Sequence, residues 1–185
     1  MSAELSDTSD EATGITGSAP ATWGEPRSKT VTWYDPRQYR TPAQEMSGLE
    51  LLQAMAAGEL PPPPIMFLLG GGALEMTAEP QHVSIRTTPD ESVYNPIGMV
   101  HGGYITTLLD TVAACAIHTT LPAGVPYTSV EIKVNFLRAV QGGMDLTAHG
   151  WVTKPGRKVA FAEADLRDAA GVVYATASTT CVILG

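Results

Sequence analysis

One carboxylate lies inside an apolar stretch of the sequence, NPIGMVHGGYITTLLDTVAACAIH, which runs from Asn95 to His118. Burial of a carboxylate is unfavourable unless the group is paired or hydrogen-bonded, and no lysine or arginine lies in this stretch to neutralise Asp110. Either a group from elsewhere binds Asp110, or the stretch opens there onto a polar cleft. A carboxylate in such a cleft can act as a base or a nucleophile. A purely structural acid would instead bond to the backbone or to a partner subunit.

The start of the same stretch offers hydrogen-bond donors to an anion. Gly102 and Gly103 follow His101, and paired glycines favour a close approach of the backbone. Because the first N–H groups of a helix have no partners within it, they can receive an oxyanion. Asn95 can add a side-chain N–H donor, and His101 can hold the preceding loop. The alternative is that the two glycines only let the helix pack under a strand.

The two features lie too far apart to serve one reaction within one chain. Gly102 and Asp110 are eight residues apart, which is ~12 Å along a helix axis. A reacting carbonyl must lie ~3 Å from its oxyanion donor and be attacked from ~3 Å away. Antiparallel pairing of two such helices would bring Gly102 of one copy near Asp110 of the other. The spacing therefore predicts an isologous homodimer with two composite sites.

The hydrophobic pattern predicts which elements hold these residues. A helix is expected over 102–119, two strands within 73–88 and a loop over 90–98. A helix with so few polar positions needs burial on most sides, which an antiparallel sheet curled around it supplies. The predicted fold class is therefore α+β, in the hot-dog arrangement of an antiparallel sheet around one long central helix. Four further strands joined by compact turns are expected at 127–138, 144–153, 158–168 and 172–184.

The first of these four strands shows regular alternation, which predicts one inward and one outward face. The apolar face carries Val130, Ile132, Val134 and Phe136. Strict alternation places Ser129 on the opposite face, together with Glu131, Lys133 and Asn135.

The N-terminal third predicts three segments of different character. Residues 1–30 are expected to form a flexible acidic tail, and residues 31–64 an arm whose aromatic side chains either clamp a neighbouring surface or stay solvated. The arm contains a short helix over 47–58 and a stiff, extended proline connector over 61–64. The main domain is placed at 65–185. The stretch FLLGGG at 67–72 is interpreted as a turn, because it lacks the Lys-Ser/Thr of a phosphate loop.

Composition excludes several classes of function. The net charge of −8 argues against a nucleic acid partner, because phosphate binding needs a basic face. No apolar run reaches the ~18 residues of a membrane span, and no leader peptide is evident, so a cytoplasmic location is expected. Cys115 and Cys181 are interpreted as two buried, reduced thiols without metal-ligand spacing. We expect neither a metal nor a cofactor.

Asn95, His101-Gly102-Gly103 and the following Asp110 resemble a motif of the hot-dog acyl-CoA thioesterases of the phenylacetate-degradation type. The segment TSVEIKVNFLR at 128–138 is similar to the strand after their helix, and the likeness covers about 95–182. The resemblance implies that the Gly102 N–H polarises a thioester carbonyl with help from Asn95, while His101 supports the loop. It also implies homodimers, often paired into tetramers, acting on acyl-CoA without metal.

The resemblance further assigns the attacking side of the site. Asp110 of the facing subunit would be general base or nucleophile, and Ser129 would lie beside it and position water. Small side chains near Asp110, Thr107 among them, leave room for an apolar acyl group, and Gly103 belongs to the expected binding surface. Three basic residues flank the Pro155-Gly156 turn and could meet the CoA phosphates, or could simply form a solvated hairpin tip: Lys154, Arg157 and Lys158.

Two other functions fit the same predicted fold. A dehydratase or hydratase of acyl thioesters needs a histidine and an acid at one carbon centre, but His118 lies ~12 Å along the helix from Asp110. A non-catalytic acyl-CoA binder or sensor would keep the pocket without needing Asp110. Loss of hydrolysis in an Asp110 variant that still binds acyl-CoA separates these functions from a thioesterase.

Overall fold

The computed structural model describes residues 20–70 and 75–184 of the chain. Two compact units are distinguished, Met1–Thr30 and Val31–Gly185. In the first unit, the described part holds a single 3-10 turn, η1 (Ala21–Trp23). Most of the expected acidic tail, residues 1–19, lies outside the described residues.

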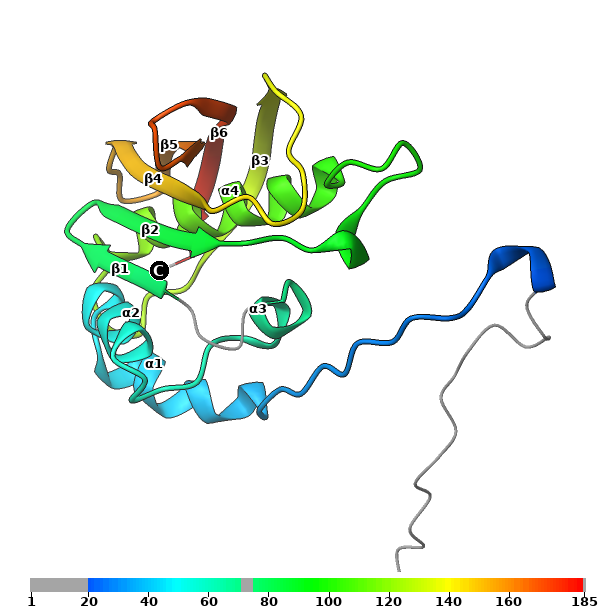
Figure 1. Ribbon diagram of the computed structural model, residues 1–185. Helices are drawn as coiled ribbons and strands as arrows, with labels where there is room; N and C mark the ends of the chain where they lie inside the picture. Colours follow the sequence, from blue (N-terminus) through cyan, green and yellow to red (C-terminus); the bar gives the residue numbers. More distant parts are fainter. Residues whose placement is uncertain (1–19, 71–74, 185) are drawn as a thin grey trace, which may run out of the picture. The chain divides into compact units, whose positions relative to one another are not determined.

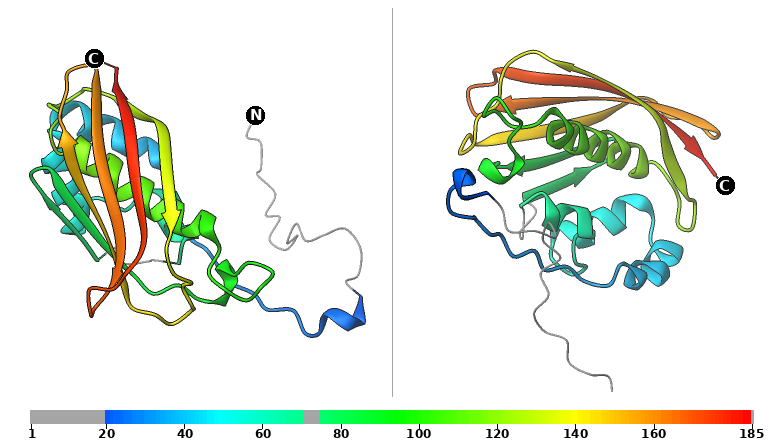
Figure 2. Two further views of the ribbon diagram at one scale, coloured as in Figure 1. Left: turned by 90° about the horizontal axis from the view of Figure 1, so that it is seen from above. Right: turned by 90° about the vertical axis from the view of Figure 1, so that its right-hand side faces the viewer.

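The second unit contains a six-stranded antiparallel sheet wrapped around one long helix, α4 (Gly102–His118). Figure 1 and the two views of Figure 2 show the sheet curving over α4. The predicted α+β hot-dog fold is confirmed. In the order β1-β2-β4-β5-β6-β3, the strands are β1 (Glu75–Glu79), β2 (His82–Thr87), β4 (Leu146–Lys154), β5 (Val159–Asp168), β6 (Val173–Ile183) and β3 (Tyr127–Phe136).

Helix α4 is buried on several sides, as its few polar positions predict. Leu109, Val112 and Ala113 are fully buried, and the helix contacts five of the six strands. Gly150 of β4 lies directly beneath it, since a Cβ atom there would come within 2.3 Å of the Val112 carbonyl group. A glycine at this position therefore lets the helix backbone rest on the sheet.

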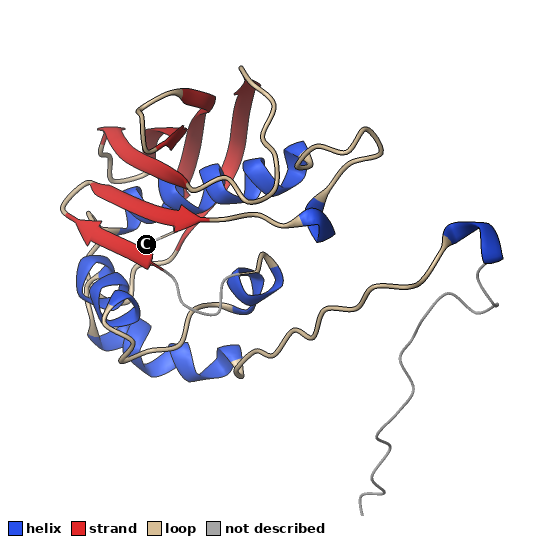
Figure 3. Ribbon diagram, viewed as in Figure 1, coloured by secondary structure: helices blue, strands red, loops and turns tan. Residues whose placement is uncertain are grey.

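The N-terminal arm is more helical than predicted. It contains η2 (Pro36–Tyr39), α1 (Arg40–Glu45) and α2 (Gly48–Ala56), and α3 (Pro64–Leu68) begins at its last residue; all are shown as blue helices in Figure 3. Only α2 was expected from the pattern. It begins with a reciprocal Ser47–Glu50 capping box and is followed by Gly58 at φ 76°, as helix ends require.

The proline connector and the glycine turn differ from the prediction at one boundary. Pro64 does not extend the connector but starts α3, where a missing N–H costs nothing because the first helical N–H has no partner. Phe67 and Leu68 therefore belong to a helix rather than to a turn. Of the predicted turn, residues 71–72 lie outside the described residues.

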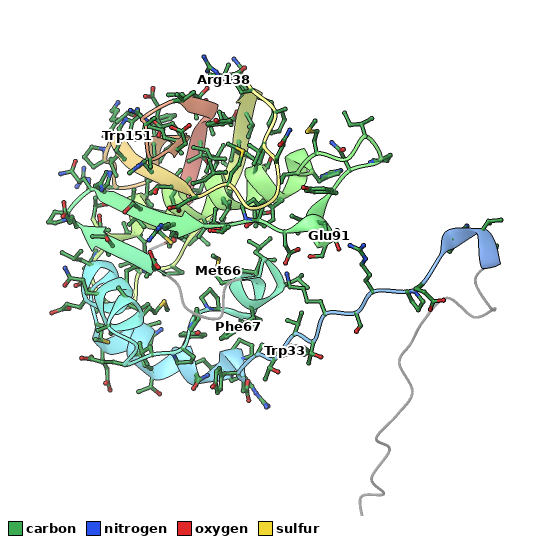
Figure 4. The ribbon with its side chains drawn as sticks, viewed as in Figure 1. Trp33, Met66, Phe67, Glu91, Arg138 and Trp151 are labelled. Carbon is green, nitrogen blue, oxygen red and sulfur yellow. The ribbon has the colours of Figure 1, made fainter. Side chains whose placement is uncertain are left out.

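The arm packs onto the same core as the sheet. Leu52 of α2 and Met66 of α3 belong to the buried cluster around α4. The Tyr34 and Phe67 rings lie 5.8 Å apart between centroids, and the Tyr39 hydroxyl donates to the Pro61 carbonyl. Figure 4 shows Met66 and Phe67 on α3, with Trp33 in the arm. The aromatic residues of the arm therefore hold it partly against its own chain.

A β-bulge in β3 overturns the strict alternation predicted for this strand. Ser129 pairs with Cys181 and Glu131 with Thr180, so that Val130 is an extra residue without a partner. Because one extra residue reverses the parity of everything before it, Ser129 shares the inner face with Ile132. Val130 is instead 58% exposed. The prediction that Val130 faces inward and Ser129 outward was wrong.

Candidate active site

Asp110 is half-buried on α4 and faces β3 at the edge of the sheet. The Ser129 hydroxyl donates a hydrogen bond of 3.0 Å to Asp110 Oδ1. The bulge at Val130 makes this contact possible by turning Ser129 inward. The group that binds the acid of the apolar helix thus comes from the same chain, and the second carboxylate oxygen has no hydrogen-bond partner among the described residues.

Two cysteines lie behind this pair. Cys181 is fully buried, with Sγ 3.7 Å from Ser129 Oγ. Cys115 is only partly buried, which corrects the expectation of two buried thiols. Burial first, and then the charge of Asp110, raises the pKa of Cys115 to about 12. Burial likewise raises the pKa of Cys181. Both are reduced thiols, and raised pKa values keep them protonated at neutral pH, so neither is an activated nucleophile.

The first turn of α4 presents one open N–H group. His101 is the N-cap residue, and its Nδ1 accepts a 2.8 Å hydrogen bond from the Gly103 N–H. The Gly102 N–H has no hydrogen-bond partner among the described residues. Of the two glycines expected to bind substrate, Gly103 therefore has its N–H occupied and Gly102 does not.

Asn95 shapes the loop in front of this helix end. Its Oδ1 accepts from the N–H groups of Ile97 and Met99, both at 3.1 Å, which leaves the Nδ2 group to donate outward. The His101 N–H donates to the Val93 carbonyl at 2.8 Å. Both residues therefore hold the loop, and Asn95 keeps a donor for a ligand as well.

Gly102 lines a pocket of about 490 Å³. The Phe136 ring covers the glycine so closely that a Cβ atom at Gly102 would lie 2.9 Å from Phe136 Cζ. Figure 4 shows Arg138 beside the end of β3, where its Nη1 donates to the Val173 carbonyl at 2.5 Å. The pocket is mostly apolar, and its lining includes Asn95, Met99, Gly102, Ile105, Phe136 and Arg138.

Thr107 lies one turn before Asp110. Its hydroxyl donates to the Gly103 carbonyl at 2.9 Å, so that the proton of this hydroxyl is used within the helix. The expectation that Thr107 binds substrate is thereby restricted to its apolar methyl group and its oxygen lone pairs.

The basic hairpin between β4 and β5 does not meet Gly102 within one chain. Pro155 and Arg157 line a pocket with residues 120–125, which follow the C-terminal end of α4. Gly102 lies at the opposite end of this 17-residue helix, ~25 Å away along its axis. A role of Lys154, Arg157 and Lys158 at the same substrate remains a prediction, and it requires a second copy of the chain.

Two kinds of feature are absent from residues 20–70 and 75–184. No helix there is both long and apolar enough to cross a membrane. No group of three or more histidine, cysteine or acidic side chains is placed to hold a metal ion in that part of the chain.

Comparison with known proteins identifies the class. The arrangement of a long central helix under a curled antiparallel sheet defines a hot-dog protein, and solved thioesterase structures match it. A putative thioesterase of Ralstonia eutropha JMP134, a phenylacetic acid degradation-related protein, superposes with a TM-score of 0.63 at 28% identity, covering 71% of this chain and 98% of its own. A Streptococcus mutans UA159 protein bound to acetyl CoA superposes with a TM-score of 0.56 at 25% identity, covering 60% and 89%.

The sequence comparisons give the family. The thioesterase superfamily model matches residues 97–175. The human acyl-coenzyme A thioesterase 13 is 30% identical over 95 residues, which are 51% of this chain and 67% of that protein. The chain belongs to the thioesterase superfamily.

Three residues near the site were not predicted from the sequence. Phe136 was assigned to the inward face but not to Gly102, and Thr179 and Cys181 of β6 were given no role. Their contacts depend on the pairing of β3 with β6, which carries no local sequence signal. The adjacent pattern TSVEI did contain a clue, because its inward serine and inward isoleucine fit one face only if one residue is extra.

Proposed function

We propose that this chain hydrolyses the thioester of an acyl-CoA to a free acid and CoA. The Asp110–Ser129 hydrogen bond at 3.0 Å carries the proposal, because it presents an oriented carboxylate on an otherwise apolar helix. The names of the relatives support the substrate class: the human relative is an acyl-coenzyme A thioesterase, and the Streptococcus mutans structure holds acetyl CoA.

In the proposed reaction, Asp110 acts in one of two ways. As a base, it takes a proton from the water whose oxygen attacks the thioester carbonyl carbon; the C–S bond breaks, the free acid forms and the CoA thiolate leaves with that proton. As a nucleophile, its carboxylate attacks the carbonyl carbon and displaces the CoA thiolate; water then hydrolyses the mixed anhydride, which releases the free acid, restores the Asp110 carboxylate and supplies the proton for the CoA thiol. Ser129 holds the carboxylate and the attacking water. The Gly102 N–H and the Asn95 amide stabilise the negative charge on the carbonyl oxygen.

We propose that each site is built from two copies of the chain. Strand β3 is the ten-residue edge of the sheet, and no other described strand pairs with its outer side. A long unpaired edge invites pairing with another chain. Exposed apolar residues continue the surface at the pocket, with Ile97 80% and Leu137 53% exposed, as expected of a face that a partner covers.

The contacts within one chain suggest the register of this pairing. Asp110 meets β3 at Ser129, and Gly102 meets it at Phe136. For Asp110 of one copy to approach Gly102 of the other, the two β3 strands must run antiparallel and pair about the middle of the strand, so that Ser129 of one copy lies opposite Phe136 of the other.

The same arrangement gives the basic hairpin a role. In antiparallel helices paired this way, the C-terminal end of α4 in one copy extends past Gly102 of the other. The partner's hairpin would then contribute its cations to the CoA phosphates. Pairing of two such dimers into a tetramer stays a prediction.

Replacing Asp110 with asparagine tests the proposed function. Asp110→Asn keeps the shape and a hydrogen-bond acceptor for Ser129 but removes the base and nucleophile, so kcat should fall by roughly 10²- to 10⁴-fold. Hydrolysis would be measured as release of CoA thiol from phenylacetyl-CoA, hexanoyl-CoA and palmitoyl-CoA. Calorimetric titration with CoA should show binding within about twofold of wild type.

Two outcomes would contradict the proposal in different ways. Unchanged hydrolysis by Asp110→Asn would remove Asp110 from the mechanism. A wild-type protein that binds these acyl-CoAs but hydrolyses none of them would be a binder or sensor rather than an enzyme.

A further inference from the structure

The inner face of β6 carries two polar side chains in an otherwise apolar row. Thr179 is 2% exposed and Cys181 is fully buried, whereas their inward neighbours are Ala175, Ala177 and Ile183. A buried hydroxyl is unfavourable unless it is hydrogen-bonded, and a valine would fill the same volume. The hydroxyl of Thr179 is therefore expected to make a hydrogen bond that a valine of the same volume could not make.

Thr179 holds the backbone next to the bulge. Its hydroxyl donates a 2.7 Å hydrogen bond to the Glu131 carbonyl on β3, and Glu131 is the residue that follows the extra Val130. A bond from the side chain of one strand to the backbone of the next fixes the place where the ladder shifts. The neighbouring Thr180 points outward and bonds the Glu131 carboxylate instead.

The position of the bulge decides which residue faces Asp110. If β3 continued from Ile132 without a shift, Val130 would pair with Cys181 on the inner face and Ser129 would point outward beside Val182. With the shift at Val130, Ser129 pairs with Cys181 and reaches Asp110. The site therefore depends on the bulge staying at this one residue.

Cys181 supplies a second contact to the Ser129 hydroxyl, in addition to the one with Asp110. The Ser129 hydroxyl proton is donated to Asp110 Oδ1, so the 3.7 Å contact between Ser129 Oγ and Cys181 Sγ has the thiol as its donor. Sulfur and oxygen then form a chain of donors that ends at the carboxylate. This chain restricts the Ser129 rotamer to the one that points at Asp110.

We propose that Thr179 and Cys181 are positioning residues for hydrolysis: Thr179 fixes the β3 bulge, and Cys181 orients the Ser129 hydroxyl toward Asp110. This inference rests on the proposed function for its kinetic consequences but not for its structural ones. Neither residue touches the substrate.

The kinetic experiment uses matched variants of the full chain. Thr179→Val removes the inward hydroxyl at nearly constant volume, and Thr180→Val removes the outward hydroxyl beside it. Loss of one hydrogen bond should lower kcat about 3- to 10-fold in Thr179→Val, with KM within about twofold, whereas Thr180→Val should behave as wild type. Cys181→Ala should lower kcat similarly, and Cys181→Ser, which keeps a donor, should recover most of the loss.

The same substitutions made in a Ser129→Ala chain separate a positioning role of Thr179 and Cys181 from general destabilisation of the fold. If Thr179 and Cys181 act through Ser129, neither substitution should lower kcat further in a Ser129→Ala chain. Equal losses in both backgrounds, or equal losses in Thr179→Val and Thr180→Val, would overturn the inference while leaving the Asp110→Asn result untouched.

A crystal structure of Thr179→Val provides a readout independent of turnover. The expected result is a moved or disordered bulge, with Ser129 Oγ beyond hydrogen-bond distance of Asp110. A retained bond of about 3 Å overturns the role of Thr179. Should Thr179→Val fail to fold, a crystal structure of Cys181→Ala tests the proposed role of Cys181, by showing whether Ser129 keeps the rotamer that points at Asp110.

Discussion

At the start of α4, the two neighbouring N–H groups of Gly102 and Gly103 differ in their hydrogen bonding. His101 Nδ1 accepts a hydrogen bond of 2.8 Å from the Gly103 N–H, whereas the N–H of Gly102, a residue that lines the pocket, has no partner among the described residues. His101 is therefore both the cap of the helix and the reason why, of these two backbone N–H groups, the one of Gly102 alone lacks a partner among the described residues. At Asp110, the single hydrogen bond from Ser129 likewise leaves the second carboxylate oxygen without a partner among the described residues.

Substitution of Gly102 by proline or by alanine separates the effect of losing the backbone N–H from the effect of adding a side chain. Gly102→Pro removes the N–H at a position where helices accept proline, and His101 already has ψ 138°, which suits the residue before a proline. Loss of an oxyanion donor should lower kcat about 10²- to 10³-fold. Gly102→Ala adds a Cβ atom against the movable Phe136 ring but keeps the donor, so it should lose far less. Equal kcat losses in the two variants would argue for crowding rather than for an oxyanion role.

His118, at the C-terminal end of α4, makes stability depend on pH. Burial lowers its pKa below the ordinary 6.5, so below that pH the unfolded chain binds a proton that the folded chain refuses. The free energy of unfolding should therefore fall as the pH drops below 6.5, until the folded pKa is passed. His118→Phe keeps a ring against Tyr127, which lies 4.8 Å away, and should flatten this dependence. Urea unfolding curves at several pH values measure it; an equally steep dependence in the variant would contradict the assignment.

At the scale of elements, the register shift in β3 matters most for the site, although the β4–β5 and β5–β6 pairings are also shifted, near Val152 and Leu166. The meander of β4, β5 and β6 forms part of the sheet surface on which α4 packs, and Gly150 determines how closely the helix approaches it. The proposed chemistry, however, depends on β3, where the bulge turns Ser129 inward. A strand that is regular from end to end could present either the apolar residues or the serine to α4, but not both.

Deleting Val130 should preserve the site. Without it, Ser129 is followed directly by Glu131, and each keeps its present partner on β6 in an unbroken ladder. The variant should fold and hydrolyse acyl-CoA within about tenfold of wild type. Deletion of Lys133, which is regularly paired with Ser178, should reverse the faces of half the strand and abolish cooperative folding. Circular dichroism melting and hydrolysis rates compare the two; loss of folding in the Val130 deletion would show that the bulge itself is needed.

At the scale of the whole molecule, the proposed site needs two copies, and this can be tested by mixing variants. A heterodimer of an Asp110→Asn chain and a Gly102→Pro chain, isolated through two different affinity tags, contains one intact composite site and one doubly damaged site. It should show about half of the wild-type kcat per dimer, although each homodimer is inactive. A heterodimer as inactive as its parents would place both groups in one chain, against the ~12 Å separation along α4.

The sequence by itself determined the parts that depend on local pattern. The apolar periodicity of α4, its glycine start, the position of Asp110 and the succession of strands follow from side-chain spacing, and these sufficed for the hot-dog fold. Only the tertiary structure decided which way Ser129 points, that Phe136 covers Gly102 and that Thr179 and Cys181 lie behind the acid. The physical reason is that strand parity is set by the hydrogen-bond register between β3 and β6. These strands meet about fifty residues apart in the chain, and one unpaired residue between them reverses every side chain before it.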